Sequence, residues 1–176
     1  MTDNRPISLD GTETESMSEG SARAATPRQL ADQRIAAWFS RHGQPYVAAG
    51  GGFAASVRPS SVEDVDPVQL RVLPTATRPP GILFAASGTK RYGTDQWPAA
   101  LTACNIWNSR EPMARARLAV QDWQADEDAA IVLEAWIPLL PSTSQDVVDA
   151  TGDGLVASAA RFWFAPADGK STTDAT

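Results

Sequence analysis

Two neighbouring segments of alternating apolar and polar residues constrain the fold of this chain more than any other feature. They span Met113–Trp123 and Ala130–Pro138. Successive side chains of a strand point to opposite faces of a sheet, so each segment predicts a strand with one apolar face. That face comprises Ala114, Ala116, Leu118 and Val120 in the first segment and Ile131, Leu133, Ala135 and Ile137 in the second. We predict an antiparallel hairpin that buries both apolar faces on the same side.

The alternation also suggests a register for this hairpin. Pairing Val120 with Leu133 and Leu118 with Ala135 brings the apolar residues together and leaves a tight loop near residues 125–128. In this register Arg117 lies opposite Trp136, within reach of a cation–π contact.

The second face of the hairpin carries a mixture of aromatic and charged side chains: Arg115, Arg117, Trp123, Val132, Glu134 and Trp136. Two interpretations remain open at this point. Either a helix or the N-terminal segment of the same chain covers the face, or it is a subunit or partner interface, because Trp and Arg are frequent interface anchors.

The rest of the chain completes an α+β pattern. Thr26 can cap a helix over Pro27–Arg41, and Thr143 begins a capping-box-like start of the last helix. The other expected elements are strands at Phe53–Arg58, Gln69–Leu73 and Ile82–Ala86 and a helix at Thr94–Asn108. Pro74, Pro79 and Pro80 argue against regular pairing between these strands. The order helix, three strands, helix, two strands, helix predicts a two-layer domain with a mainly antiparallel sheet.

Composition limits the domain organisation and the class of partner. Residues 1–25 and 167–176 are polar, so we expect a disordered leader and a flexible tail around one domain at residues 26–166. The net charge of −6 disfavours binding to nucleic acid or to an anionic membrane surface. A single cysteine and a polar N-terminus lead us to expect a cytoplasmic protein.

The sequence offers few groups for catalysis or metal binding, and we expect no enzyme activity and no cofactor. His42 is the single histidine and Cys104 the single cysteine. A pocket formed by His42, Cys104 and Trp107 is the alternative, which predicts a small-molecule-binding or weakly enzymatic domain. The carboxylates Asp122, Asp126, Glu127 and Asp128 lack the spacing of a calcium loop and fit a solvated turn, and the same holds for Glu63, Asp64 and Asp66.

A short motif carries a family resemblance. Asn105-Ile106-Trp107-Asn108 near the end of a helix is followed by a strand with an Arg-x-Arg pair, an apolar strand and a final helix ending in Phe162-Trp163-Phe164. With this layout the chain resembles the YbjN family, whose domain is similar to type III secretion chaperones. The resemblance covers about residues 27–165.

The resemblance implies a non-enzymatic, chaperone-like or regulatory domain without a cofactor, often dimeric. We therefore expect a protein-binding module or homodimer that uses Arg115, Arg117, Trp123, Glu134 and Trp136 for its contacts. The same resemblance implies that Asn105 and Asn108 form hydrogen bonds at the end of the helix and that Trp107 holds this helix against the sheet.

Overall fold

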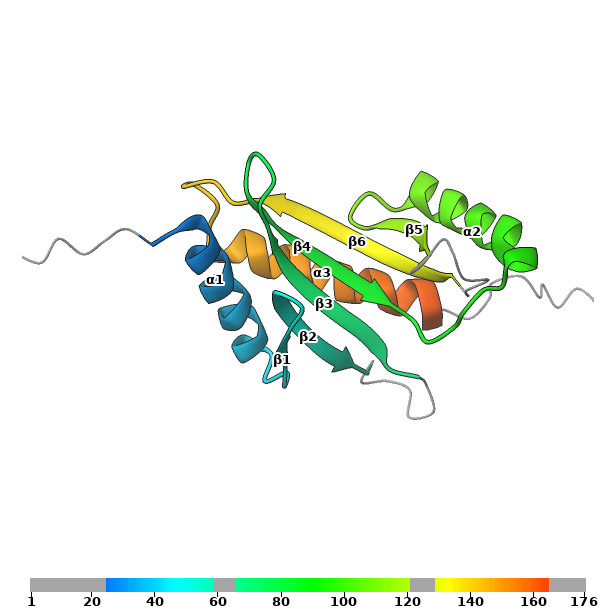
Figure 1. Ribbon diagram of the computed structural model, residues 1–176, viewed down its shortest axis with the longest axis horizontal. Helices are drawn as coiled ribbons and strands as arrows, with labels where there is room; N and C mark the ends of the chain where they lie inside the picture. Colours follow the sequence, from blue (N-terminus) through cyan, green and yellow to red (C-terminus); the bar gives the residue numbers. More distant parts are fainter. Residues whose placement is uncertain (1–24, 59–65, 121–128, 165–176) are drawn as a thin grey trace, which may run out of the picture.

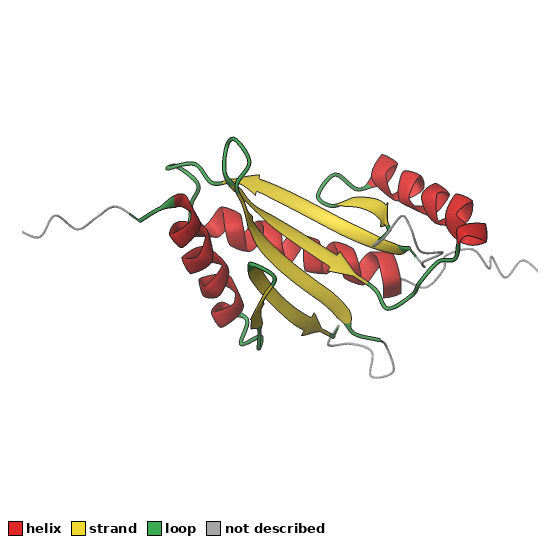
Figure 2. Cartoon of the chain, in the orientation of Figure 1, coloured by secondary structure: helices red, strands yellow, loops and turns green. Residues whose placement is uncertain are grey.

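The computed structural model describes residues 25–58, 66–120 and 129–164. Three α-helices and six strands form an α+β fold, which confirms the predicted class (Figures 1 and 2). The elements in chain order are α1 (Pro27–Arg41), β1 (Val47–Ala49), β2 (Gly52–Val57), β3 (Val68–Thr75), β4 (Gly81–Ser87), the short 3-10 helix η1 (Thr94–Gln96), α2 (Trp97–Arg110), β5 (Arg115–Ala119), β6 (Ala130–Pro138) and α3 (Gln145–Phe164). The predicted leader and tail lie almost entirely outside the described residues.

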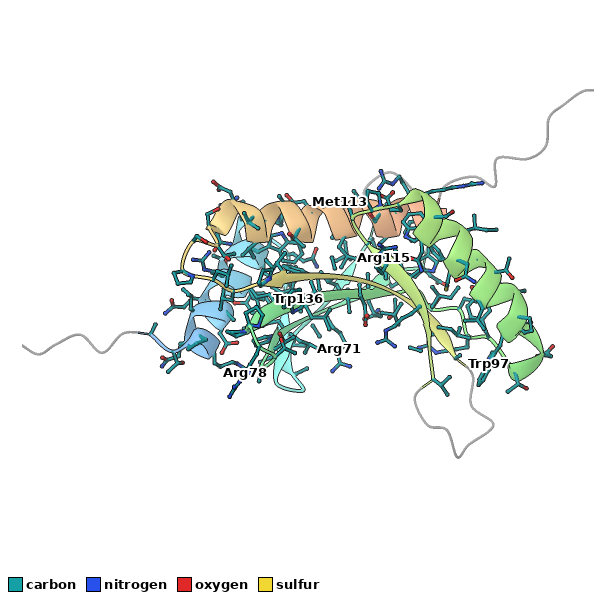
Figure 3. All side chains as sticks on the ribbon, turned by 90° about the horizontal axis from the view of Figure 1, so that it is seen from above. Arg71, Arg78, Trp97, Met113, Arg115 and Trp136 are labelled. Carbon is teal, nitrogen blue, oxygen red and sulfur yellow. The ribbon has the colours of Figure 1, made fainter. Side chains whose placement is uncertain are left out.

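The strands form one antiparallel sheet with the order β1-β2-β3-β4-β6-β5. Helices α1 and α3 pack against each other and against the central strands on one side of this sheet (Figures 1 and 3). Helix α2 instead lies along β5 at the edge. The result is a helical layer over one face of the sheet, with a third helix closing one end.

The core lies between the sheet and the α1–α3 layer, where alternate strand residues meet the helices. Phe84 of β4, Leu133 of β6 and Leu70 of β3 are fully buried, as are Ile35 of α1 and Leu155 of α3. The intervening strand residues point to the other face. Alternation in the sequence therefore marks the core face correctly.

The sequence prediction missed strand β1. Ala49 pairs with Gly52, so Gly50 and Gly51 form a two-residue turn between β1 and β2. Both glycines have positive φ, 56° and 78°, the combination that a type I′ hairpin turn requires. The Gly-Gly pair was the available signal for a hairpin, but its first strand is only three residues long.

The prediction that prolines prevent regular pairing of the middle strands is wrong. Strands β3 and β4 pair continuously from Gln69↔Ser87 to Thr75↔Gly81, with Pro74 opposite Ile82. Pro74 is tolerated because the β2 pairing of β3 ends at Val72, so the other side of β3 is an edge at this point.

The last helix, α3, packs closely on α1 through a glycine. A Cβ atom on Gly152 would lie 2.5 Å from Cε2 of Trp38, so the indole ring rests directly on the α3 backbone. At the start of α3 it is the Ser144 hydroxyl that accepts from the N–H of Val147 (3.4 Å). The Thr143 hydroxyl donates to the carbonyl of Pro138 (2.9 Å), so Thr143 belongs to the preceding turn rather than to the predicted capping box.

Candidate functional site

The face of the sheet opposite α1 and α3 gathers the side chains that the sequence marked for binding. We call this surface the open face and define it by Gln69, Arg71 and Leu73 of β3, Leu83, Ala85 and Ser87 of β4, Arg115 and Arg117 of β5, and Val132, Glu134 and Trp136 of β6. Most of these residues, together with Arg91, line a shallow groove of about 300 Å³. Figure 3 shows Arg71 and Trp136 on the side of the sheet away from α3.

The strand register places the open-face residues in rows across the sheet. Arg71, Ala85, Glu134 and Arg115 form one row, and Leu73, Leu83 and Trp136 form the next. The two rows are adjacent on the same face, because their members lie two residues apart along each strand. An apolar centre is thus flanked by charged side chains from three different strands.

The open face is basic although the chain is acidic. Among the described residues, it carries the guanidinium groups of Arg71, Arg115 and Arg117, with Arg91 lining the groove, and the one carboxylate of Glu134. Arg117 donates to Oε1 of Glu134 at 2.6 Å. This hydrogen bond raises the pKa of Arg117 above its ordinary value, so the guanidinium remains charged. The remaining arginines leave a net positive surface for an anionic group.

Trp136 supplies a large aromatic surface at one end of the open face. The residue is 44% exposed, and its Nε1 donates to the Thr75 hydroxyl at 3.3 Å. Gly81 leaves room for the ring, because a Cβ there would lie 2.5 Å from Nε1. The indole is therefore held in place while much of it stays accessible to a ligand.

The hairpin register differs from the predicted one. Leu118 pairs with Ile131 instead of Ala135, and Val120 follows the end of β5 at Ala119, beyond the pairs with β6. Alternation fixed the correct face for each residue but not the shift along the strand, which depends on the length of the connection. The predicted tight loop at 125–128 lies outside the described residues.

The shifted register also changes the partner of Arg117. Arg117 lies opposite Val132, and its guanidinium bonds to Glu134, so the predicted contact with Trp136 is wrong. Trp123, the remaining predicted interface residue, lies outside the described residues.

The Asn105–Asn108 motif holds α2 against the edge of the sheet. The Asn108 side chain donates to the carbonyl of Ala116 (2.9 Å) and accepts from its N–H (2.7 Å). Trp107 Nε1 donates to the carbonyl of Ala114 at 2.9 Å, and its ring packs edge-on against Phe162. Asn105 is exposed. Asn108 thus gives β5 the pair of hydrogen bonds that a neighbouring strand would make.

The alternative pocket is not assembled. His42 Nε2 lies 2.9 Å from Oδ1 of Asp153 in the middle of α3, whereas Trp107 contacts Phe162 near its end. Nine helical residues correspond to about 13 Å, and α1 and α2 lie at opposite ends of the molecule (Figure 1). Cys104 is buried, and burial raises the pKa of its thiol, which opposes nucleophilic chemistry.

A polar cluster between α1 and α3 was not found by the sequence reasoning. Asp149 is only 4% exposed, forms an ion pair with Arg41 and accepts a hydrogen bond from Gln145 Nε2 (2.9 Å). Asp153 accepts one hydrogen bond from Trp38 Nε1 (2.9 Å), and the same carboxylate faces His42. The two acids lie four residues apart on one side of α3, a spacing that could have indicated a shared role. The cluster joins the two helices.

Arg71 is the second omission. It alternates with Gln69 and Leu73 on β3, but the expected disruption by Pro74 concealed its pairing with the hairpin strands. Within residues 25–58, 66–120 and 129–164, no three potential ligands form a cluster that could bind a metal ion. None of the described helices is long and apolar enough to span a membrane.

Comparisons with known proteins give a result at the level of structure. No protein-family model matches the chain, and no curated protein matches it by sequence. The crystal structure of YbjN, a candidate transcription regulator from E. coli, is similar with a TM-score of 0.57 and 12% sequence identity. The match covers 79% of this chain and 91% of YbjN. The predicted resemblance is confirmed for the fold: this chain has the fold of YbjN.

Proposed function

We propose that this chain is a non-enzymatic protein-binding module, chaperone-like or regulatory, that holds a segment of a partner protein on its open face. The observation that carries the proposal is the exposed indole of Trp136 beside an apolar groove and several arginines, in a chain of net charge −6. Tryptophan and arginine are the residues that most often dominate binding energy at protein interfaces.

The chemistry of the groove favours a polypeptide with both apolar and acidic side chains. Leu73, Leu83 and Val132 offer apolar contacts along the floor, and the arginines around them fit carboxylates. The net charge of the whole chain disfavours nucleic acid. The description of YbjN as a candidate regulator also supports a regulatory role.

The test is capture of partner proteins by the full chain from its native cell, followed by quantitative mass spectrometry. Arg117→Glu places a second carboxylate beside Glu134 and reverses one charge of the groove. We expect it to reduce capture at least tenfold, as does Trp136→Ala, since a central anchor contributes about 2 kcal/mol or more. Arg110→Glu is the matched control, because this exposed arginine makes the same charge change on α2.

The outcome that opposes the proposal is equal capture by the wild type, the two open-face variants and the control. Circular dichroism of each variant shows whether the fold is retained, so loss of binding is distinguished from loss of structure.

We also propose that the chain forms a homodimer. Leu101 of α2 is 47% exposed and offers apolar surface to a second copy. Light scattering measures the mass in solution, and a concentration-independent monomer contradicts this proposal. Leu101→Glu is expected to shift a dimer toward the monomer, because it places a charge on that surface.

A further inference from the structure

Residues 1–24 of this chain are rich in acidic side chains. We propose that residues 1–24 dock on the open face and compete with a partner for it. This inference rests on the proposed function, since it assigns the same surface a second, intramolecular occupant. The open face and residues 1–24 have opposite net charge. The open face and Arg91 carry four guanidiniums and one carboxylate, whereas residues 1–24 contain five acids and two arginines. The five acids are Asp3, Asp10, Glu13, Glu15 and Glu19.

The point where the segment joins the fold favours this occupant. Thr26 caps α1 and lines a groove together with Thr75 and Gly81. Both of these residues contact Trp136. The Thr75 hydroxyl accepts a hydrogen bond from the indole N–H, and the indole ring packs against Gly81. Thr26, two residues after this segment, therefore lies near the Trp136 end of the open face.

The dimensions also fit. In extended form 24 residues reach about 80 Å, whereas the open face measures about 14 Å from β3 to β5. In an extended chain Glu13 and Glu15 share one side, at the spacing of Arg115 and Arg117 on β5. Ile7 and Leu9 are apolar groups that suit the row formed by Leu73 and Leu83. Because the segment is tethered, its effective concentration at the face reaches the millimolar range, so a weak intrinsic affinity suffices.

The acidic connection between β5 and β6 is the competing occupant within the chain. It joins the fold at Ala119 and Ala130. Ala130 lies six residues along β6 from Trp136, which corresponds to about 20 Å. The indole of Trp136 therefore reports on the end of the face near Thr26 and distinguishes the two segments.

The experiment uses the full chain with a nitroxide label at Ser8→Cys in a Cys104→Ala background. Nuclear magnetic resonance follows the indole N–H signals of Trp136 and Trp38. Trp38 is the internal control, because its N–H donates to Asp153 within the helical layer on the other side of the sheet. We expect the nearby nitroxide to remove most of the intensity of the Trp136 signal and to leave the intensity of the Trp38 signal unchanged. Equal attenuation of the two, or none, overturns the inference.

A label-free measurement covers the case in which Cys104→Ala unfolds the protein. A variant with the five acids of residues 1–24 changed to Asn or Gln leaves the described fold untouched. The Trp136 indole signal should shift between wild type and variant, and the Trp38 signal should not. An unchanged Trp136 signal overturns the inference. If capture still depends on Arg117 and Trp136 in that case, the proposed function stands while the intramolecular occupant is rejected.

Discussion

At the scale of single residues, one side-chain amide makes the two hydrogen bonds that a neighbouring strand would make with β5. Asn108 satisfies both the carbonyl and the N–H of Ala116 in β5. An unsatisfied backbone group away from water is costly, so a side chain that pairs with both groups stabilises the edge. The motif that carries the resemblance to YbjN therefore has a direct structural role in this chain.

Asn108→Ala removes both hydrogen bonds and should lower the free energy of unfolding by about 1–3 kcal/mol. Urea denaturation measures the change. Asn105→Ala is the matched control, because the exposed Asn105 lies on the same helix and its loss should change stability by no more than about 0.5 kcal/mol. Equal effects of the two substitutions contradict the role assigned to Asn108.

The buried thiol gives a pH dependence with a defined sign. Burial raises the pKa of Cys104 above its ordinary value of 9.0. Burial, and then the neighbouring Cys104, raise the pKa of Tyr92 above 10.0. The unfolded chain therefore loses these protons at lower pH than the folded chain, and stability falls as the pH rises through these values.

We expect the free energy of unfolding, measured in urea between about pH 7 and pH 10, to decrease less steeply in Cys104→Ala than in the wild type. Comparing the two slopes removes the contribution of groups common to both proteins. Parallel slopes contradict a raised thiol pKa.

At the scale of the elements, the sequence predicted the features that depend on neighbouring residues, namely the start of a helix and the face to which a strand residue points. Thr26 and Pro27 located the start of α1, and alternation assigned Leu118 and Leu133 to the same face, as the structure shows. The register between those strands could not be derived, because a shift by an even number of residues preserves the alternation. Pairing around Pro74 was missed since it depends on where β2 ends, which is a property of the assembled sheet.

The candidate site was predicted in part for the same reason. Arg115, Arg117, Glu134 and Trp136 share the open face because alternation alone puts them there. Arg71 comes from β3, and only the strand order β3-β4-β6-β5 brings it into the same row as Glu134. Long-range pairing of this kind leaves no local pattern in the sequence.

The contact between α1 and α3 provides a test with its own control. Gly152→Ala should destabilise the fold by about 1–3 kcal/mol, since the new Cβ overlaps the ring of Trp38. Gly154→Ala in the same helix meets only the terminal Cε of Met113 at 3.1 Å. It should be neutral or stabilising by up to about 1 kcal/mol, because alanine favours the helix. Thermal unfolding of both variants measures the difference, and the reverse order contradicts this packing.

At the scale of the whole molecule, the two faces of one sheet differ in composition and in cover. The face under α1 and α3 holds the core, and the open face carries charge and an exposed indole. Substitutions on the two faces should therefore have different consequences for stability and binding.

Leu133→Ala should cost about 2–5 kcal/mol of unfolding free energy, because it empties space in the core. Arg71 lies on β3, in the same sheet as Leu133, but on the open face. Arg71→Ala should therefore change the free energy of unfolding by less than about 0.5 kcal/mol and still weaken partner capture. Urea denaturation and quantitative capture measure the two effects. A large stability loss in Arg71→Ala contradicts this division.

Side-chain amides bond to backbone groups at two places on the borders of the sheet. Asn108 pairs with the edge strand β5, and Gln44 Nε2 donates at 3.0 Å to the carbonyl of Ser56, in the part of β2 that lies beyond its pairs with β1. Unpaired strand edges are the usual templates for fibrous aggregation. A strand from another copy that adds at either of these places must first displace the amide.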